Sequence, residues 1–499
     1  MNLRNRVVRQ VGGLVLAGAL AGMPPAAAAE PIRAPLVTEA EPVELPPVTH
    51  RTLENGLELW IAERTQQPIA LFQLVIPRGD LLDPPGKEGL ASFTAQLLQQ
   101  GTESRSAEEI AGAMDFVGGS LSAGTSAERT TVSAAVLSKD AGFALDLLAD
   151  VVLHPTFPER EVEILRNQFL GGVRQERDDS SQLASTHAAA FFYGAGHRLG
   201  RPESEASVQV IGREDVVAFH RDHYGPKGAM LIAVGDLDPA WVEAAVRKSL
   251  GSWKGPAAPA PSAPEVPQLE ESRVRWVAKP GQTQVQIRLR QNGPARTAND
   301  WLAVQVYNYV LGGGGFSSRL MQVVRSELGQ TYGIGTGYTA YRFPGGMQLG
   351  TFTRNDSVWA TLDAIRQELG RFRDEGISEA ELAAAKSHLL GSFPLQMETL
   401  SGMAGTIAEA LFYDGTLDAI RTYPEQVASL TRAQVNAAIK AHLDPERFAV
   451  VLLGDPAVLE EAPGGEVLGV PVELVEQVDW QAPVEGFTLA ATAQSAEGD

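Results

Sequence analysis

Histidine is the side chain that could hold a transition metal here, because the chain contains no cysteine among its 499 residues. His220 and His223 lie three positions apart in an amphipathic stretch, a spacing that places two ligands on one helix face. In the second half of the chain His442 repeats His223, but Ile439 stands where a match for His220 would be. The remaining histidines are scattered along the chain: His50, His154, His187, His197 and His388. We therefore interpret the histidines as packing residues and not as a metal site.

Arg325 and Tyr332 lie seven positions apart in the run Arg-Ser-Glu-Leu-Gly-Gln-Thr-Tyr. Arginine offers a rigid fork of donors to a peptide carbonyl, and a tyrosine hydroxyl can support the oxyanion of a tetrahedral intermediate. A surface arginine followed by a strand tyrosine would produce the same pattern. The spacing alone therefore leaves a substrate-binding pair and an ordinary surface pair both open.

Four consecutive glycines, residues 312–315, precede this pair. A nucleotide-binding loop would follow a strand and end in Gly-Lys-Ser/Thr. This run instead follows a helix-like segment, residues 301–311, and continues into Phe-Ser-Ser-Arg. Nucleotide binding is thus not favoured, and Gly313 and Gly314 are interpreted as a flexible turn that lets a peptide or partner backbone approach closely.

Several short patterns predict where helices begin and where strands lie. Ser/Thr-x-x-Glu/Gln capping boxes begin at Ser106, Ser378 and Thr431, and Asp238 precedes a proline at a first helical position. Apolar or alternating runs predict strands over residues 70–77, 130–137, 285–289 and 347–352. Helices and strands mix without strict alternation, so the fold class is predicted to be α+β and not a doubly wound parallel sheet.

The chain is predicted to consist of two related halves joined by a linker. Residues 252–272 are rich in proline and alanine, which is typical of an extended interdomain segment. His223, Pro226 and Gly235 recur as His442, Pro445 and Gly454 at one common offset, which indicates an internal duplication. The predicted organisation is a signal peptide 1–29, a first domain 45–251, the linker 252–272, a second domain 273–487 and a disordered tail 488–499.

Composition narrows the class of protein. A hydrophobic content of 44% with 20% charged residues is typical of a soluble globular protein, and the length calls for more than one core. A formal net charge of −20 argues against a nucleic-acid partner, since phosphate binding needs a basic face.

The N-terminus has the pattern of an export signal. Arg4, Arg6 and Arg9 precede an apolar run over residues 11–21, and three alanines at 27–29 suit a signal peptidase. The apolar run is short for a bilayer span, although an uncleaved anchor helix is the alternative interpretation. We expect a periplasmic protein that does not insert into the membrane once the signal has been removed.

Several motifs, taken in order, resemble the insulinase/pitrilysin family of zinc metallopeptidases, in the branch that includes mitochondrial processing peptidase. They are Arg78-Gly79-Asp80, residues 85–102, residues 196–202 (Gly-His-Arg-Leu-Gly-Arg-Pro) and residues 311–320 (Leu-Gly-Gly-Gly-Gly-Phe-Ser-Ser-Arg-Leu). The resemblance covers nearly the whole chain after residue 55. It implies two homologous domains, each a mainly antiparallel sheet with helices packed on one face.

The resemblance also implies a zinc site whose ligands are missing from this chain. The inverted zinc motif H-x-x-E-H places two imidazoles and a general-base glutamate on one helix. Here those positions are Ser92, Ala95 and Gln96, and the position of the third family ligand falls at Gly172. A serine hydroxyl and an amide are poor zinc ligands, and alanine and glycine offer none. Glu176, one turn after Gly172, is a single carboxylate, so this chain is expected to bind no zinc and to have no catalytic residues of its own.

In the family the side of the groove opposite the zinc supplies an arginine and a tyrosine that hold the substrate backbone. The resemblance therefore assigns Arg325 and Tyr332, with Gly313 and Gly314, to substrate binding. The chain is then expected to be inactive alone, as the non-catalytic subunit of an exported heterodimeric zinc peptidase. Its homologous partner would carry H-x-x-E-H and the zinc, and the pair would hydrolyse unfolded peptides.

Two other hypotheses remain open. The chain could be a non-enzymatic scaffold or a peptide-binding protein, like the core subunits that this family contributes to respiratory complexes. It could also be a self-sufficient hydrolase that uses Ser92, but no histidine stands at a recognisable spacing from that serine.

Overall fold

The computed structural model describes residues 44–257 and 265–486. The predicted signal peptide 1–29 and the tail 488–499 lie outside the described residues, as does the middle of the linker 252–272. Within the described ranges no helix is both long and apolar enough to cross a membrane.

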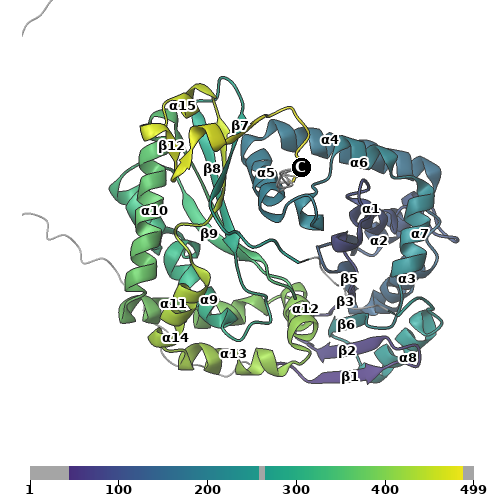
Figure 1. Ribbon diagram of the computed structural model, residues 1–499. Helices are drawn as coiled ribbons and strands as arrows, with labels where there is room; N and C mark the ends of the chain where they lie inside the picture. Colours follow the sequence, from purple (N-terminus) through teal and green to yellow (C-terminus); the bar gives the residue numbers. More distant parts are fainter. Residues whose placement is uncertain (1–43, 258–264, 487–499) are drawn as a thin grey trace, which may run out of the picture. The chain divides into compact units, whose positions relative to one another are not determined.

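The first half contains a six-stranded sheet in the order β1-β2-β6-β3-β5-β4 (Figure 1). The strands are β1 (Val48–Thr52), β2 (Glu58–Glu63), β3 (Ile69–Ile76), β4 (Ser120–Thr125), β5 (Thr130–Leu137) and β6 (Met230–Gly235). Only β2 and β6 pair in parallel, and the other neighbours are antiparallel.

The second half contains a sheet with the related order β14-β7-β11-β8-β10-β9. Its strands are β7 (Arg273–Ala278), β8 (Gln284–Asn292), β9 (Ile334–Thr339), β10 (Gly346–Arg354), β11 (Ala449–Gly454) and β14 (Glu476–Asp479). A small two-stranded ribbon, β12 (Glu466–Val467) and β13 (Val470–Pro471), lies apart from this sheet. In the six-stranded sheet, the strand pairs β11–β8, β8–β10 and β10–β9 are antiparallel, while β7 pairs in parallel with β11 and β14.

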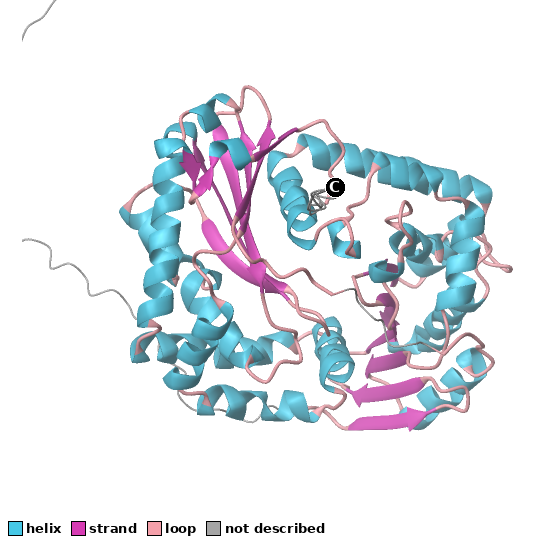
Figure 2. Ribbon diagram, in the orientation of Figure 1, coloured by secondary structure: helices cyan, strands magenta, loops and turns pink. Residues whose placement is uncertain are grey.

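Each sheet packs its own helices on one face, as Figure 2 shows in cyan and magenta. The first-half helices are α1 (Leu90–Leu97), α2 (Ala107–Phe116), α3 (Ala141–Leu153), α4 (Glu159–Asp178), α5 (Ser180–Tyr193), α6 (Glu205–Val210), α7 (Arg213–His223) and α8 (Pro239–Leu250). The second-half helices are α9 (Trp301–Asn308), α10 (Val358–Glu375), α11 (Glu379–Gln396), α12 (Leu400–Glu409), α13 (Asp418–Ser429), α14 (Arg432–His442) and α15 (Ala457–Glu460). The α+β prediction of two similar domains with mainly antiparallel sheets is confirmed.

The opposite face of each sheet is covered by a helix from the other half, a feature that the sequence did not predict. In β3, Phe72 packs into the core shared with first-half helices, whereas Leu71 and Val75 pack with Ile407 of α12. In the same way Phe191 of α5 packs with Val451 of β11 in the second sheet. We call this arrangement the helix exchange. It explains why central strands are apolar on both faces.

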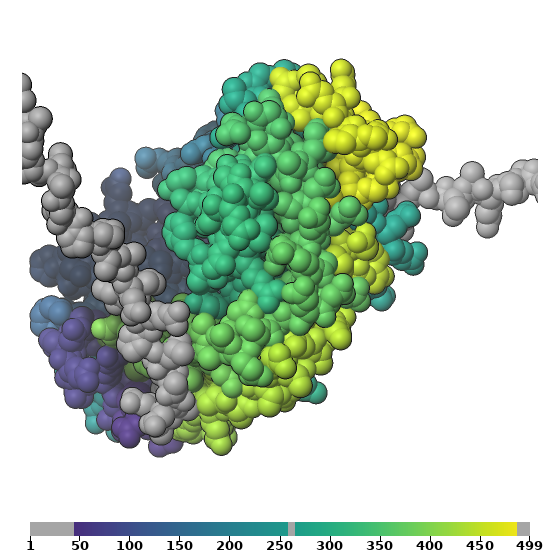
Figure 3. Space-filling model, turned by 90° about the vertical axis from the view of Figure 1, so that its left-hand side faces the viewer, coloured from purple at the N-terminus to yellow at the C-terminus, as the bar shows by residue number. Residues whose placement is uncertain are grey.

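The predicted helix starts occur as expected. Ser106, Ser378 and Thr431 each accept a hydrogen bond from the backbone N–H three residues on, and the capping boxes are complete. Asp238 caps α8 by accepting from the backbone N–H of Trp241 at 2.7 Å. The outer surface of the second half, formed mostly by residues coloured green, is visible in Figure 3.

Candidate functional site

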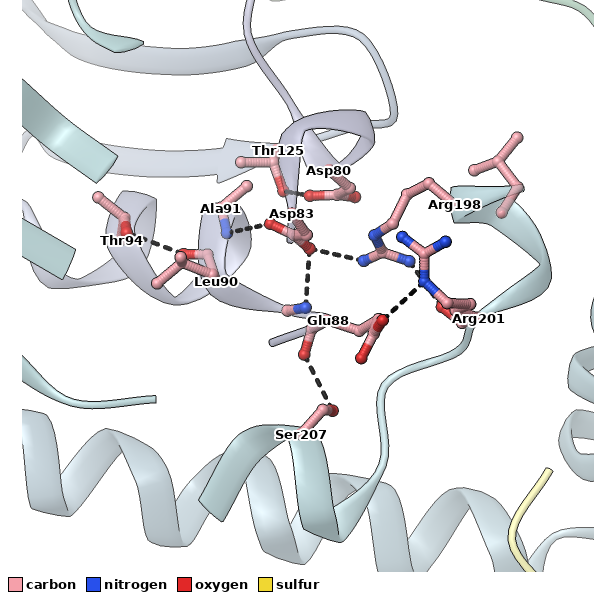
Figure 4. Close-up of polar contacts among 12 residues, drawn as sticks. Asp80, Asp83, Glu88, Leu90, Ala91, Thr94, Thr125, Arg198, Arg201 and Ser207 are labelled. Atoms are coloured by element: carbon pink, nitrogen blue, oxygen red, sulfur yellow. Dashed lines mark hydrogen bonds and ion pairs between the residues drawn. The ribbon is translucent and has the colours of Figure 1, made fainter. Parts of the chain in front are cut away.

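A buried carboxylate fixes the start of α1, the helix that would carry the zinc motif. Asp83 accepts hydrogen bonds from the backbone N–H groups of Gly89 at 2.8 Å and Ala91 at 2.7 Å (Figure 4). Arg198 donates to the same carboxylate at 2.6 Å. A carboxylate at a helix N-terminus satisfies unpaired N–H groups and interacts favourably with the helix dipole. The position of α1 is therefore held by residues that are independent of any metal.

A second layer of polar contacts surrounds this anchor. Glu88 pairs with Arg201 at 2.8 Å, and its backbone carbonyl accepts from the Ser207 hydroxyl at 3.1 Å (Figure 4). Thr125 of β4 donates to Asp80 at 2.6 Å. The start of α1 is thus tied to the segment after α5 and to α6, and the turn Asp80–Leu82 before it is tied to β4.

Two carboxyl groups in this region have strongly raised pKa values. Burial raises the pKa of Asp80 to about 6, against the opposing effect of the Thr125 hydrogen bond. The Glu203 side chain is exposed at the surface, but surrounding protein atoms exclude part of the water from its carboxyl group. This desolvation is the largest effect, and the negative charges of Asp80 and Asp83 add to it. Together they raise the pKa of Glu203 to about 7.

The positions that correspond to zinc ligands lie together on α1, but their side chains do not suit zinc. Ser92 and Gln96 lie one turn apart and are partly buried, and the Gln96 amide lies 3.4 Å from the Ser92 hydroxyl. Ala95 between them is fully buried. None of the three offers an imidazole, a thiolate or a carboxylate, so this donor set does not fit a zinc ion.

Gly172 lies on α4, the helix beside α1, where Phe93 and Phe169 pack edge to face at 5.2 Å. A Cβ added at Gly172 would meet no atom within 4 Å. Glu176, one turn later, accepts a hydrogen bond from Thr186 of α5. Gly172 is therefore exposed and offers no ligand, and the Glu176 carboxylate is hydrogen-bonded to Thr186.

The histidines occupy separate packing positions. His220 lies 2.8 Å from the carbonyl oxygen of Val152, and His442 lies 2.6 Å from the Asp300 carboxylate. Burial lowers the pKa of His187 to about 3, so this side chain is neutral. Across residues 44–257 and 265–486, no three histidine or acidic side chains converge in a way that could hold a metal ion.

The outer edge of β4, beside α1, is occupied by a side chain of this protein. With its amide oriented to satisfy both groups, Gln99 donates to the carbonyl of Leu121 at 2.7 Å and accepts from the N–H of Ala123 at 3.1 Å. Backbone groups at a sheet edge are the ones with which an added peptide strand would pair. The Leu121 carbonyl and the Ala123 N–H of this edge are therefore already hydrogen-bonded.

The structure brings Arg325 and Tyr332 together and adds a third residue. The Arg325 guanidinium lies 4.8 Å from the ring centre of Tyr332 and 4.5 Å from that of Phe316. Both rings are largely exposed, Tyr332 at 76% and Phe316 at 69%. Within the described residues no acceptor or carboxylate contacts Arg325, so its in-plane N–H donors are free. Phe316 was not predicted as a site residue, although it directly follows the glycine run.

The first three glycines of the run, Gly312 to Gly314, are closely packed and do not form an open turn. Residues Tyr309–Gly313 form a π-helical turn that continues α9. A Cβ at Gly312 would lie 2.6 Å from the backbone nitrogen of Thr336 in β9, and one at Gly313 would lie 2.7 Å from the Asn308 side chain. A Cβ at Gly314 would lie 2.7 Å from the carbonyl of Tyr309. The chain's own packing thus accounts for these glycines, and a contact of Gly313 or Gly314 with substrate stays a prediction.

Comparison with known proteins identifies the family. The sequence profile of the family Insulinase (Peptidase family M16) matches residues 59–202, and that of the Peptidase M16 inactive domain matches residues 211–389. An uncharacterized zinc protease of Mycobacterium bovis is 32% identical over 374 residues, which cover 73% of this chain and 84% of the relative. An uncharacterized zinc protease of Bacillus subtilis is 26% identical over 70% of this chain and 84% of the relative.

Solved structures give the same assignment. A peptidase M16 inactive domain from Pseudomonas fluorescens superimposes with a TM-score of 0.76 and 27% identity, covering 82% of this chain and 98% of that one. The periplasmic protease PqqL from Escherichia coli shares the fold, with a TM-score of 0.71 and 17% identity over 85% of this chain and 47% of that one. The chain belongs to the insulinase family of peptidases, peptidase family M16.

Proposed function

We propose that this chain is the non-catalytic subunit of an exported heterodimeric zinc peptidase. The observation that carries the proposal is the exposed contact of Arg325 with the rings of Phe316 and Tyr332. Contact with two aromatic rings restricts the guanidinium, and its N–H donors, which have no acceptor among the described residues, can bind a peptide carbonyl. The Tyr332 side chain is exposed, and its hydroxyl, which has no hydrogen-bond partner among the described residues, can donate to an oxyanion.

The contrast between the two halves supports a divided role. The first half keeps the buried Asp83–Arg198 anchor of α1, but Ser92 and Gln96 stand where a peptidase of this kind carries zinc ligands. Gln99 already bonds the edge of β4. The substrate-facing chemistry that remains is in the second half. The proposal is that a homologous partner with an intact H-x-x-E-H supplies the zinc and that the pair hydrolyses unfolded peptides.

Export is part of the proposal. The basic and apolar pattern of residues 1–29 suits a signal peptide. The relative PqqL is described as periplasmic. A periplasmic location is therefore proposed for the mature chain.

The test is reconstitution with a homologue from the same organism that carries H-x-x-E-H. Each chain is assayed alone and mixed, with a quenched fluorescent peptide. We expect no hydrolysis by this chain alone and strong hydrolysis by the mixture. Tyr332→Phe should lower kcat by about 100-fold, the usual loss for one oxyanion donor. Arg325→Ala should mainly raise KM. The control Arg354→Ala, which removes an exposed arginine that pairs with Asp356, should change neither kcat nor KM.

Hydrolysis by the isolated chain, or a partner that is fully active alone, would overturn the proposal. If Arg325→Ala and Tyr332→Phe leave the mixture's activity unchanged, the chain acts as a scaffold. Size-exclusion chromatography of each variant with the partner separates a loss of assembly from a loss of substrate contact.

A further inference from the structure

A cavity of about 440 Å³ lies between α5 and the face of the second sheet that α5 covers. Its walls are Ser185 and Ala188 of α5, and its floor comes from β8, β10 and β9. Gly333, the residue after Tyr332, lines one end of it. The lining of the cavity therefore includes the residue that directly follows the proposed substrate-binding Tyr332.

Several of the residues on the floor of the cavity, in β9 and β10, are glycines without a side chain. Strand register places Gly337, Gln348 and Arg290 in one row across β9, β10 and β8. The next row contains Gly335, Gly350 and Arg288. The position of a Cβ at Gly350 lies 3.6 Å from the Arg288 side chain, so this arginine extends over the glycine.

The glycines thus leave the backbone of β9 and β10 without side chains on this face, next to Arg288 and Arg290 of β8. Glycine gives access to the backbone at the cost of strand stability, so its repetition at one face of β9 and β10 favours close approach by a ligand.

The two arginines differ in how far their donors are used. Arg288 donates to Ser185 at 3.0 Å, to the Ser181 hydroxyl at 2.7 Å and to the carbonyl of Thr351 at 3.0 Å. Arg288 therefore fastens α5 to the sheet. Arg290 makes a single hydrogen bond among the described residues, 3.2 Å to the Gln348 side chain.

No aspartate or glutamate among the described residues forms a salt bridge with either arginine. Burial lowers the pKa of Arg290, the direction expected for a cation that has lost hydration without gaining a counter-ion. In a chain of net charge −20, the Arg290 guanidinium is thus a positive charge without a salt-bridge partner among the described residues. A partly buried cation is stabilised when an anion with hydrogen-bond acceptors enters the site.

The geometry points to a carboxylate subsite in this cavity, in which Arg290 and Gln348 bind a peptide's carboxylate while the backbone lies over Gly335 and Gly337. The inference rests on the proposed function, because it assigns a chemical preference to the same peptide substrate. It predicts that substrates carry a free C-terminus or an acidic side chain at the end that extends past Tyr332.

The test measures binding of dye-labelled, unstructured peptides to the full chain by fluorescence anisotropy. One pair of peptides ends in a carboxylate or an amide, and a second pair, both amidated, carries Glu or Gln at an internal position. We expect the carboxylate member of at least one pair to bind roughly tenfold more tightly, as for a charge-assisted hydrogen bond. The pair that shows the difference identifies the source of the carboxylate.

Two variants assign the effect to Arg290. Arg290→Gln should abolish the difference in affinity between the two peptides of the pair. Gln348→Glu, at an exposed position, should also abolish it, because the new carboxylate would pair with the intact Arg290. Arg221→Gln, which changes the net charge equally at an exposed position on α7, should keep the difference. Circular dichroism checks that each variant is folded.

Equal binding within both pairs would overturn the subsite and leave the proposed function standing, as would a difference that survives both variants. Failure of every peptide to bind, with the mixture of subunits also inactive, would contradict both proposals.

Discussion

At the scale of single residues, an arginine that contacts two aromatic rings is partly ordered before any substrate binds. A free arginine loses up to about 2 kcal/mol of side-chain entropy when it is fixed. Each exposed cation–π contact contributes about 0.5–1 kcal/mol, so Phe316 and Tyr332 together offset most of that loss. Binding of a peptide carbonyl by Arg325 then carries a smaller entropic penalty.

The raised pKa of Glu203 predicts a stability that depends on pH. Since its pKa rises to about 7 on folding, the folded protein holds a proton that the unfolded chain releases above its ordinary value of 4.5. Between these values the free energy of unfolding falls as pH increases. In Glu203→Gln we expect a flatter profile and a higher Tm than wild type at pH 8, measured by thermal unfolding from pH 4.5 to 8. Glu214→Gln, an exposed control, should keep the wild-type slope; a Glu203→Gln profile identical to wild type would contradict the assignment.

At the scale of elements, the π-helical turn Tyr309–Gly313 positions α9 against the edge strand that leads to the site. Gly312 makes the closest contact, since Thr336 of β9 lies where its side chain would be. Thr336 also donates to Asn308 at 2.8 Å, at the end of α9. The glycine run therefore fixes the relation between α9 and β9, which in turn sets where Tyr332 emerges.

Gly312→Ala should destabilise the protein by about 1–3 kcal/mol, the usual cost of overpacking. Its added methyl group would lie 2.5 Å from the Thr336 hydroxyl and 2.6 Å from its backbone nitrogen. Gly171→Ala is the matched control, because it is an exposed position inside α4 with no atom within 4 Å of a Cβ. That change should leave stability equal or slightly higher, since alanine favours helix. Denaturant unfolding of both variants checks the comparison, and equal effects would show that the contact is unimportant.

Local patterns predicted elements well, and contacts between distant segments were not predictable. The capping boxes at Ser106 and Ser378 depend on residues three positions apart, and both occur. The strand predicted over residues 130–137 is β5 (Thr130–Leu137). By contrast, nothing near Arg290 in the sequence indicates that Gln348 is its neighbour, because that pairing depends on the register of β8 and β10. Alternating glycines at 333, 335 and 337 were a usable signal for a bare sheet face.

At the scale of the whole molecule, the helix exchange joins the two halves into one folding unit. Met403 and Ile407 of α12 pack on the first sheet, and Phe191 and Phe192 of α5 pack on the second. Ion pairs cross between the halves as well, such as Arg129 with Glu409 at 2.6 Å. Within residues 44–257 and 265–486, each sheet therefore has one face that packs against a helix of the other half.

Ile407→Ala should therefore lower the stability of both halves together. Ile407 is fully buried against strands of the first half although it belongs to the second, and its truncation should cost about 2–5 kcal/mol. Differential scanning calorimetry is expected to show one transition in wild type and one, at lower temperature, in the variant. Two resolved transitions in either protein would mean that the halves unfold independently.

The helix exchange also dictates how a lone half would behave. A polypeptide ending at residue 257 would have α5 without a sheet to cover and a sheet without α12. In a dimer of two such copies, α5 of each copy could cover the sheet of the other. A truncated first half is therefore expected to form a domain-swapped homodimer. On this view a gene for one half already encodes a self-complementary oligomer, and fusing two copies would turn that oligomer into a monomer whose halves were free to diverge.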